Sequence, residues 1–503
     1  MGTLLSVFAV AAPVLAQDAR PAADLQEVLS LTLQYSPRLE SARRALDRAR
    51  GVWQQSGAPF DPLVRSSVTS QREQTLLPPA VGASAASYLG VDGLEYRVEG
   101  EKLLRSGISI RPVVQVSQSR TTGVGTAPSG VATAALQVAV PLLNDRGGRV
   151  TGAPERAAEL ALQASGHDLR FVASTVIRDA VTVWWTYMAA RDRLVIQLEA
   201  ETRAQRMTLE TQRLVAADER PAADMRQVEA NVASKRAARI QAEQRVLEAQ
   251  RDLALAVGVD PERLTAAFDA TSTFPTIDFG PDTSGATARY LALADSARED
   301  VHALRRLSDA SRVEADGVTG SLKPRADLAL SAGYDGYAAR WGVPGLVRPF
   351  VQNTSGLKGA VQLSYQWPVL NVGARGRLAQ AEAIVRQQDV QLAEARRRAH
   401  ASVRVAWSAV RASRASLQEA SRSVSLYEET VENEMTKFRL GTSTLFDIIN
   451  AEDALTAARL AAVSSQQAHA QAVVDLRFAT GTLVSVDHDA VRAPASRPLT
   501  LPN

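Results

Sequence analysis

Between Gly376 and Gly441 the chain contains neither glycine nor proline, the residues that most often interrupt or end a helix. An unbroken α-helix over this stretch would be on the order of 95 Å long, about three times the hydrocarbon thickness of a membrane. Apolar residues recur in it at every seventh position, the spacing of a supercoiled helix pair: Val403, Val410, Leu417, Val424, Val431 and Phe438. The chain is therefore predicted to build long coiled-coil helices. Taken by themselves, these helices are as typical of an ordinary soluble helical bundle as of any other architecture.

The long helix belongs to one of two copies of a repeated unit. Trp184 and Trp407 are separated by the same number of residues as Asp224 and Asp447. Each copy is predicted to contain an opening helix, strands, a long helix and a returning helix of about half its length. The predicted helices span 24–55, 154–218 and 221–257 in the first copy, and 287–317, 376–441 and 444–480 in the second. The predicted divisions are a first repeat at 17–258, a linker at 259–286, a second repeat at 287–482 and a C-terminal tail at 483–503.

Apolar and polar residues alternate in the segments between the helices, which predicts strands with one apolar face. Strands of about ten residues with aromatic residues near one end are typical of a transmembrane barrel, in which one face meets lipid. A sheet half-buried on a soluble core also alternates, but no spare apolar helix is predicted that could cover it. The residues expected to face lipid are Val361, Leu363, Tyr365, Trp367, Leu328, Leu330, Leu136, Val138 and Val140.

Two further segments alternate in the same way, at residues 96–101 and 108–117. If both enter the membrane, each chain supplies six strands and a trimer eighteen; otherwise they form a separate hairpin beside a barrel of twelve. Gly100, Pro112 and the charged residues 99–102 disfavour a full membrane span. Twelve strands are therefore expected.

Composition excludes several other classes of function. The chain has no cysteine, which removes disulfides, thiol nucleophiles and an acylated N-terminal cysteine. Its 57 basic and 54 acidic residues nearly cancel, so there is no case for binding nucleic acid. The five histidines are scattered, and no phosphate-binding glycine loop is present. No catalytic, cofactor or metal site is expected. Residues 1–16 have the apolar run and small-residue end of a secretory signal peptide.

Four stretches resemble the TolC-like outer-membrane efflux family: residues 36–39, 140–144, 367–371 and 438–452. The resemblance implies a mainly α-helical fold with a membrane β-barrel, in which three chains share one barrel and one periplasmic α-helical tunnel. It implies a passive export duct of a tripartite efflux or type I secretion system, located in the outer membrane and extending into the periplasm. The expected partners are a homotrimer, a periplasmic adaptor, an inner-membrane pump and outer-membrane lipid. The alternative is a soluble periplasmic coiled-coil adaptor or scaffold.

The resemblance also assigns roles to the turns of the two helical hairpins. The second turn would contact the adaptor through Leu440, Gly441, Thr442, Ser443 and Thr444, and the first through Asp218, Glu219 and Arg220. From the residues alone, a glycine followed by Thr and Ser is equally typical of an ordinary turn that ends one helix and caps the next.

A periplasmic gate is implied at Asp447, Asn450 and Asp224. Asp447 matches an acidic ring at the closed entrance, and Asn450 stands where some members have a second Asp. Phe438 and Ser443 occupy the places of a Tyr and an Arg that lock the entrance in some members, so the usual lock is not expected. Asp447 and Asp224 can also be read as solvated carboxylates that complement the dipoles of the helices they begin.

Overall fold

The computed structural model describes residues 25–77, 87–122, 127–260, 262, 274, 285–351, 355–487, 490–492 and 500–502. The predicted signal peptide and most of the predicted linker lie outside these residues. The chain divides into two units. The helical unit comprises Met1–Arg43, Leu169–Glu299 and Arg396–Asn503, and the sheet unit comprises Arg44–Asp168 and Asp300–Ala395.

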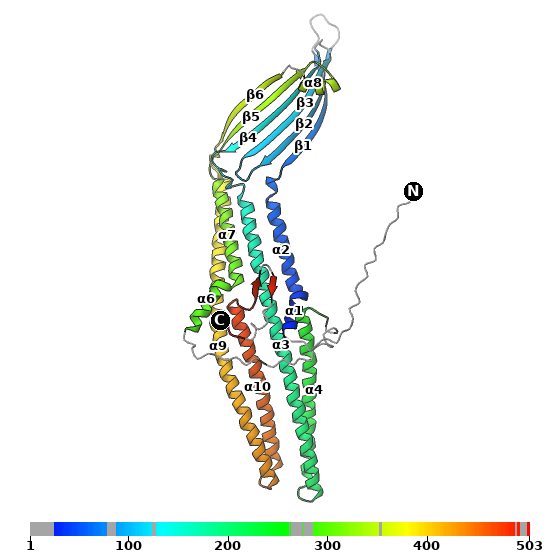
Figure 1. The fold of residues 1–503 in the computed structure, drawn as a ribbon, viewed down its shortest axis with the longest axis vertical. Helices are drawn as coiled ribbons and strands as arrows, with labels where there is room; N and C mark the ends of the chain where they lie inside the picture. Colours follow the sequence, from blue (N-terminus) through cyan, green and yellow to red (C-terminus); the bar gives the residue numbers. More distant parts are fainter. Residues whose placement is uncertain are drawn as a thin grey trace, which may run out of the picture. The chain divides into compact units, whose positions relative to one another are not determined.

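The sheet unit is built on six consecutive strands, each antiparallel to the next (Figure 1). They are β1 (Leu63–Leu77), β2 (Ser87–Leu103), β3 (Ser109–Thr122), β4 (Ser129–Pro141), β5 (Arg325–Ala338) and β6 (Ser355–Gln366). We call the end where β1 joins β2, β3 joins β4 and β5 joins β6 the loop end, and the opposite end the helix end. The short helices η1 (Ala58–Phe60) and α8 (Val343–Val351) complete this unit, together with the helical segments 44–56, 153–168, 300–320 and 372–395.

The expected separate hairpin at residues 96–116 is wrong, because β2 and β3 lie inside the sheet between β1 and β4. Gly100 and Pro112 lie side by side on these two strands, where a Cβ added to Gly100 would be 2.9 Å from Pro112 Cγ. The glycine thus makes room for the proline ring. Two residues that disfavour a strand when taken singly are compatible as a pair.

The strand register gives the sheet an apolar face. Directly opposed residues share a face, and Leu330 lies opposite both Val138 and Val361, while Leu328 lies opposite both Val140 and Leu363. By the same register Leu136 and Tyr365 belong to this face. Trp367 follows the last residue of β6 and is exposed.

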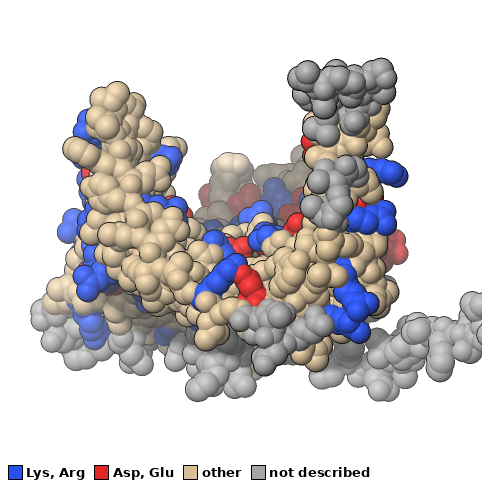
Figure 2. Space-filling model, turned by 90° about the horizontal axis from the view of Figure 1, so that it is seen from above, with Lys and Arg blue, Asp and Glu red and all other residues tan. Residues whose placement is uncertain are grey.

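The opposite, polar face carries ion pairs on β1, β2 and β3. Glu101 accepts hydrogen bonds from Arg111 at 2.9 Å and from Arg65 at 3.5 Å, and Glu99 accepts one from Arg97 at 3.2 Å. Seen from above, the surface of the molecule carries basic side chains with a few acidic ones beside them (Figure 2). The sheet therefore has two chemically different surfaces, one apolar and one charged.

The helical unit contains two hairpins of long helices. The first pairs α3 (Ala153–Ala216) with α4 (Ala223–Val257), and the second pairs α9 (Val372–Arg439) with α10 (Leu445–Ala479). The helices α3 and α9 are 64 and 68 residues long, and their first parts belong to the sheet unit. The cores of the hairpins contain Trp184 and Trp407, and the Trp407 ring lies 5.3 Å from that of Tyr290.

Each predicted opening helix is broken in two. The first becomes α1 (Leu25–Tyr35) and α2 (Pro37–Ser56), and the second becomes α6 (Ala286–Ala297) and α7 (Glu299–Gly320). The first break precedes a proline, which disfavours helical geometry in the residue before it.

A left-handed glycine packs against each break. A Cβ on Gly258 would be 2.5 Å from the carbonyl oxygen of Tyr35, and one on Gly481 would be 2.5 Å from that of Ala297. These glycines follow α4 and α10, so both returning helices end against a broken opening helix in the same way. The predicted tail begins just beyond Gly481 and includes a small hairpin of β7 (Ser485–Asp487) and β8 (Ala490–Arg492).

Candidate functional site

The candidate site is formed by the turns of the two helical hairpins, residues 217–222 and 440–444. In the second turn Gly441 adopts a left-handed conformation, with φ of 76°, and the amide of Thr442 donates to the carbonyl of Lys437 at 2.9 Å. The first turn has no glycine. Asp218 adopts the left-handed conformation there instead, with φ of 59°, which Asp tolerates better than most residues.

Arg220 connects the two turns. Its Cζ lies 4.5 Å from the centroid of the Phe438 ring, and its Nη2 donates to the carbonyl oxygen of Ser443 at 3.4 Å. Phe438 is itself buried, in an apolar cluster with Met207, Val228, Leu445 and Ile448. The first turn is therefore held against the second by a cation–π contact over an apolar core.

Asp447 closes a capping box at the start of α10. Its amide donates to Thr444 Oγ1 at 3.3 Å, and its Oδ2 accepts from the Thr444 amide at 3.0 Å. Hydrogen bonds from the side chain and backbone of Thr444 lower the pKa of Asp447. This carboxylate is exposed, as is Asn450, whereas Asp224 is half-buried in the first turn of α4.

Ser443 joins a second carboxylate to this turn. Its hydroxyl donates to Glu434 Oε2 at 2.8 Å and lies 3.5 Å from Asp447 Oδ2. Lys437 donates to Glu434 Oε1 at 2.7 Å, and the bonds from Lys437 and Ser443 lower the pKa of Glu434. Two carboxylates, Glu434 and Asp447, are thus held on either side of the Ser443 hydroxyl.

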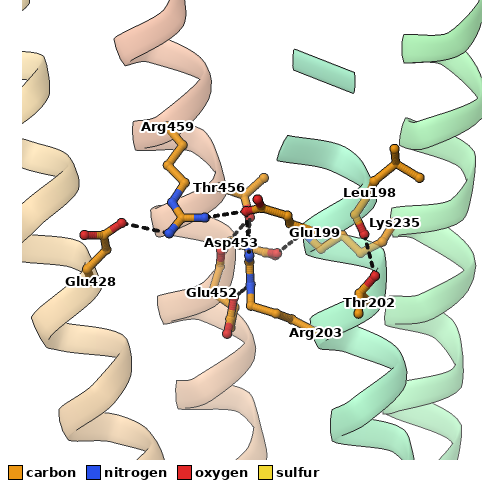
Figure 3. Close-up of polar contacts among 10 residues, drawn as sticks. All are labelled: Leu198, Glu199, Thr202, Arg203, Lys235, Glu428, Glu452, Asp453, Thr456 and Arg459. Atoms are coloured by element: carbon orange, nitrogen blue, oxygen red, sulfur yellow. Dashed lines mark hydrogen bonds and ion pairs between the residues drawn. The ribbon is translucent and has the colours of Figure 1, made fainter. Parts of the chain in front are cut away.

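A network of ion pairs joins the two hairpins farther along the helices (Figure 3). Arg203 of α3 donates to Glu452 of α10 at 2.6 Å. Arg459 of α10 donates to Glu199 of α3 at 2.8 Å and to Glu428 of α9 at 2.7 Å. Sequence reasoning missed this network, because Glu and Arg spaced one turn apart are usual on a solvated helix face.

The network extends to the fourth helix of the two hairpins, because Lys235 of α4 forms an ion pair with Asp453 of α10. A further ion pair set connects α3 with α4, where Arg239 and Arg236 donate to Glu201 at 2.7 and 3.1 Å. Burial raises the pKa of Glu201, but the hydrogen bonds from the two arginines outweigh it and the pKa is lowered. All four helices are therefore connected by charged contacts.

Among the residues that the structure describes, no group of three or more His, Cys, Asp or Glu is placed to hold a metal ion. Within the same residues, no helix combines the length and the apolar character needed to cross a membrane.

Residues 290–482 match the family model of outer membrane efflux proteins. No curated protein matches the chain by sequence. Among solved structures, the outer-membrane channel OprN is 18% identical with a TM-score of 0.64, over 91% of this chain and 90% of that one. The CmeC outer membrane channel of Campylobacter jejuni is 16% identical with a TM-score of 0.64, over 91% and 85%. The MtrE outer membrane channel of Neisseria gonorrhoeae, in its open state, is 17% identical with a TM-score of 0.60, over 91% and 88%. These matches confirm the resemblance to the TolC-like outer-membrane efflux family: residues 290–482 match the efflux-protein model, and over 91% of its length the chain has the fold of these outer-membrane channels.

Proposed function

We propose that this protein is the outer-membrane export duct of a tripartite efflux or type I secretion system. The duct is passive, and an inner-membrane pump supplies the energy through a periplasmic adaptor. The observation that carries this proposal is the six-stranded sheet with one apolar and one charged face, in a chain that matches the efflux-protein family. A soluble adaptor would leave the apolar face exposed to water.

The extent of the apolar face supports its contact with lipid. On β2, Asp92 and Lys102 are the charged residues of this face, and only Leu94, Tyr96, Val98 and Gly100 lie between them on it. Ten residues of strand span about 34 Å, or about 26 Å across the membrane at a tilt of about 40°. The lipid-facing band of outer-membrane barrels is about 25 Å tall.

Charged partners mark the loop end of this band. Asp92 lies 3.4 Å from Arg72 Nε of β1 and 3.1 Å from Arg120 Nη2 of β3, in one row across the three strands. Between this row and Lys102 the apolar face carries no charged residue in the described strands. We infer that the row lies at the outer boundary of the hydrocarbon layer and Lys102 at the inner one.

The sheet edges support assembly with other copies. Within the described chain β1 and β6 each pair with a single strand, and open edges are a liability that barrels remove by closure. Six successive antiparallel strands leave β1 and β6 running in opposite directions, so β6 of one copy and β1 of the next can pair antiparallel. In a homotrimer these pairings give eighteen strands and a barrel about 36 Å across its backbone, against about 24 Å for twelve strands.

The hairpin turns are proposed to be the periplasmic entrance and the adaptor contact. Leu440 and Phe446 are exposed, at 74% and 60%, in an otherwise polar region, which favours contact with another protein. Asp447 and Asp224 would line the entrance. Opening would then separate the α9–α10 turn from the α3–α4 turn and break the contact between Arg220 and Phe438.

Cell fractionation tests the proposal against the soluble adaptor. The duct is expected in the outer-membrane fraction, released by detergent and not by high salt. Recovery of the folded protein in the periplasmic fraction without detergent would overturn the proposal and favour the adaptor.

A further inference from the structure

Helix α8, in the connection between β5 and β6, lies at the loop end of the sheet (Figure 1), and two glycine contacts place it on the apolar face. Gly336 and Gly130 belong to this face by register. A Cβ on Gly336 would be 1.7 Å from the carbonyl oxygen of Pro349, and one on Gly130 would be 2.5 Å from that of Gly345. Backbone contact this close requires glycine on the strands, so α8 is packed directly against the sheet.

A polar contact fixes the start of this connection. The amide of Gly342 donates to Oε1 of the buried Gln118 side chain at 2.7 Å. The Cζ of Arg120 lies 5.2 Å from the centroid of the Trp341 ring. Both Gln118 and Arg120 are on the apolar face of β3, so α8 is held next to the charged row that contains Asp92.

The outward side of α8 is apolar, the reverse of a helix that packs on a soluble protein. Its buried residues are Gly345 and Pro349, which have little or no side chain to contribute to a core. Four of its five large apolar residues are exposed, namely Val343, Val347, Phe350 and Val351, with exposed fractions of 73, 56, 43 and 76%, while Leu346 is half-buried. An exposed apolar surface of this kind indicates that α8 contacts an apolar environment.

The charged residues of this segment indicate which apolar environment α8 contacts. The segment 338–351 contains Arg340 and Arg348, both exposed, and no acidic residue. Apolar side chains together with arginines are typical of helices that lie at the surface of a bilayer with anionic headgroups. A neighbouring copy of the chain is not expected to cover the apolar side chains of α8. Such a copy would pair with β1 or β6, whereas α8 contacts β3, β4 and β5.

We propose that α8 is an interfacial anchor that inserts Val343, Val347, Phe350 and Val351 into the outer rim of the bilayer, with Arg340 and Arg348 at anionic headgroups. The inference rests on the proposed function, since it requires the apolar face to meet lipid. Such an anchor would help to fix the depth of the barrel in the membrane.

The absence of cysteine from the sequence allows a direct test with single-cysteine variants. Val347→Cys is labelled with an environment-sensitive fluorophore in protein reconstituted into vesicles of phosphatidylcholine and phosphatidylglycerol. Val361→Cys and Gln362→Cys, neighbours on the apolar and polar faces of β6, calibrate lipid and water exposure. Position 347 is expected to be quenched by nitroxide lipids, more by a shallow label than by a deep one, and to be protected from iodide.

Two outcomes would overturn the anchor in different ways. Quenching of position 347 by iodide, while position 361 is quenched by nitroxide lipids, would overturn the anchor and leave the duct standing. If position 361 were quenched by iodide and not by nitroxide lipids, the apolar face would not meet lipid, and the proposed duct would be overturned as well.

A second variant tests the packing that holds α8. Gly336→Ala places a Cβ against Pro349 and is expected to displace α8, reducing nitroxide quenching at position 347 but not at position 361. Gly359→Ala is the matched control, because a Cβ on this glycine of the same face has its nearest neighbour at 4.0 Å. Unchanged quenching at position 347 in Gly336→Ala would contradict the proposed seat of the helix.

Discussion

The guanidinium group of Arg220 lies over the ring of Phe438, with 4.5 Å between the arginine Cζ and the ring centroid. Arg220 lies in the turn of the first hairpin and Phe438 in the last turn of α9, so the contact joins the two hairpins. Arg220 also donates to the Ser443 carbonyl, so the first turn contacts both the second turn and the end of α9. The chemistry of the contact with Phe438 is cation–π rather than a pair between a carboxylate and an arginine or tyrosine.

Replacement of Arg220 tests whether this contact holds the entrance closed. Arg220→Ala removes the cation–π contact and a hydrogen bond, a loss of about 1 to 2 kcal/mol. The variant is expected to show a higher single-channel conductance in planar bilayers and greater sensitivity of cells to large hydrophilic antibiotics. Arg226→Ala, at an exposed arginine of α4, is the control. Equal conductance of the Arg220→Ala and control channels would argue against a lock at this position.

The capping box of α10 gives a prediction about pH. The hydrogen bonds from Thr444 lower the pKa of Asp447 in the folded protein. The stabilisation is therefore fully present above the unfolded pKa of about 3.9, and is lost as pH falls through the lower folded value. Between pH 7 and 5 the Asp447 carboxylate stays ionised, so its titration is not expected to change the protection of residues 445–449 from hydrogen exchange. Below about pH 4 the carboxylate becomes protonated, and this protection is expected to fall.

Thr444→Ala provides the matching variant. It removes the cap and is expected to weaken the start of α10 by about 1 kcal/mol at neutral pH. The acid-dependent part of the exchange should then be smaller than in the unaltered protein. An undiminished acid response would mean that another group is responsible.

The pair of Arg203 and Glu452 tests the network of Figure 3. Both side chains are largely buried, with exposed fractions of 23% and 12%, so their coupling is expected to exceed that of surface pairs. A double-mutant cycle with Arg203→Ala and Glu452→Ala should give a coupling free energy of about 1 kcal/mol for local opening of α10, measured by hydrogen exchange. The exposed pair of Glu382 and Arg386, one turn apart on α9, is the control; measured on local opening of α9, it should give less than about 0.5 kcal/mol. Equal coupling free energies for the two pairs would show that the ion pairs of the network contribute no more than ordinary surface ion pairs.

The contact between Gly100 and Pro112 gives a prediction about barrel assembly. Gly100→Val places side-chain atoms where Cβ alone would be 2.9 Å from the proline ring, and overpacking of this kind typically costs about 1 to 3 kcal/mol. The assembled form is expected to dissociate at a lower temperature on gels of heated samples. Gly359→Val, at the open position on the same face, should leave that temperature unchanged. The same outcome for both variants would show that β2 and β3 do not share the wall of the barrel.

The sequence predicts some of these features well, for physical reasons that can be named. Leu328, Leu330, Val361 and Leu363 can be placed on one face because the period of a strand is two and the alternation is uninterrupted. The separate hairpin was a wrong expectation, because Gly100 and Pro112 disfavour a strand singly and their compensation is visible only once they are opposed.

Other features depend on contacts that no local pattern reveals. Helix α8 contains Pro344, Gly345 and Pro349, which are typical of a loop, and most of its large apolar residues are exposed. The contact between Arg220 and Phe438 joins segments far apart in the chain, so it requires the packing of two hairpins. The ion pairs of Figure 3 could be located only once α3 and α10 were known to lie together.

Electron microscopy of the detergent-extracted protein tests the central claim most directly. The expected particle has threefold symmetry and an eighteen-stranded barrel in which β6 of each copy pairs with β1 of the next. A barrel of twelve strands with residues 87–122 outside its wall, or a water-soluble particle without a barrel, would contradict it.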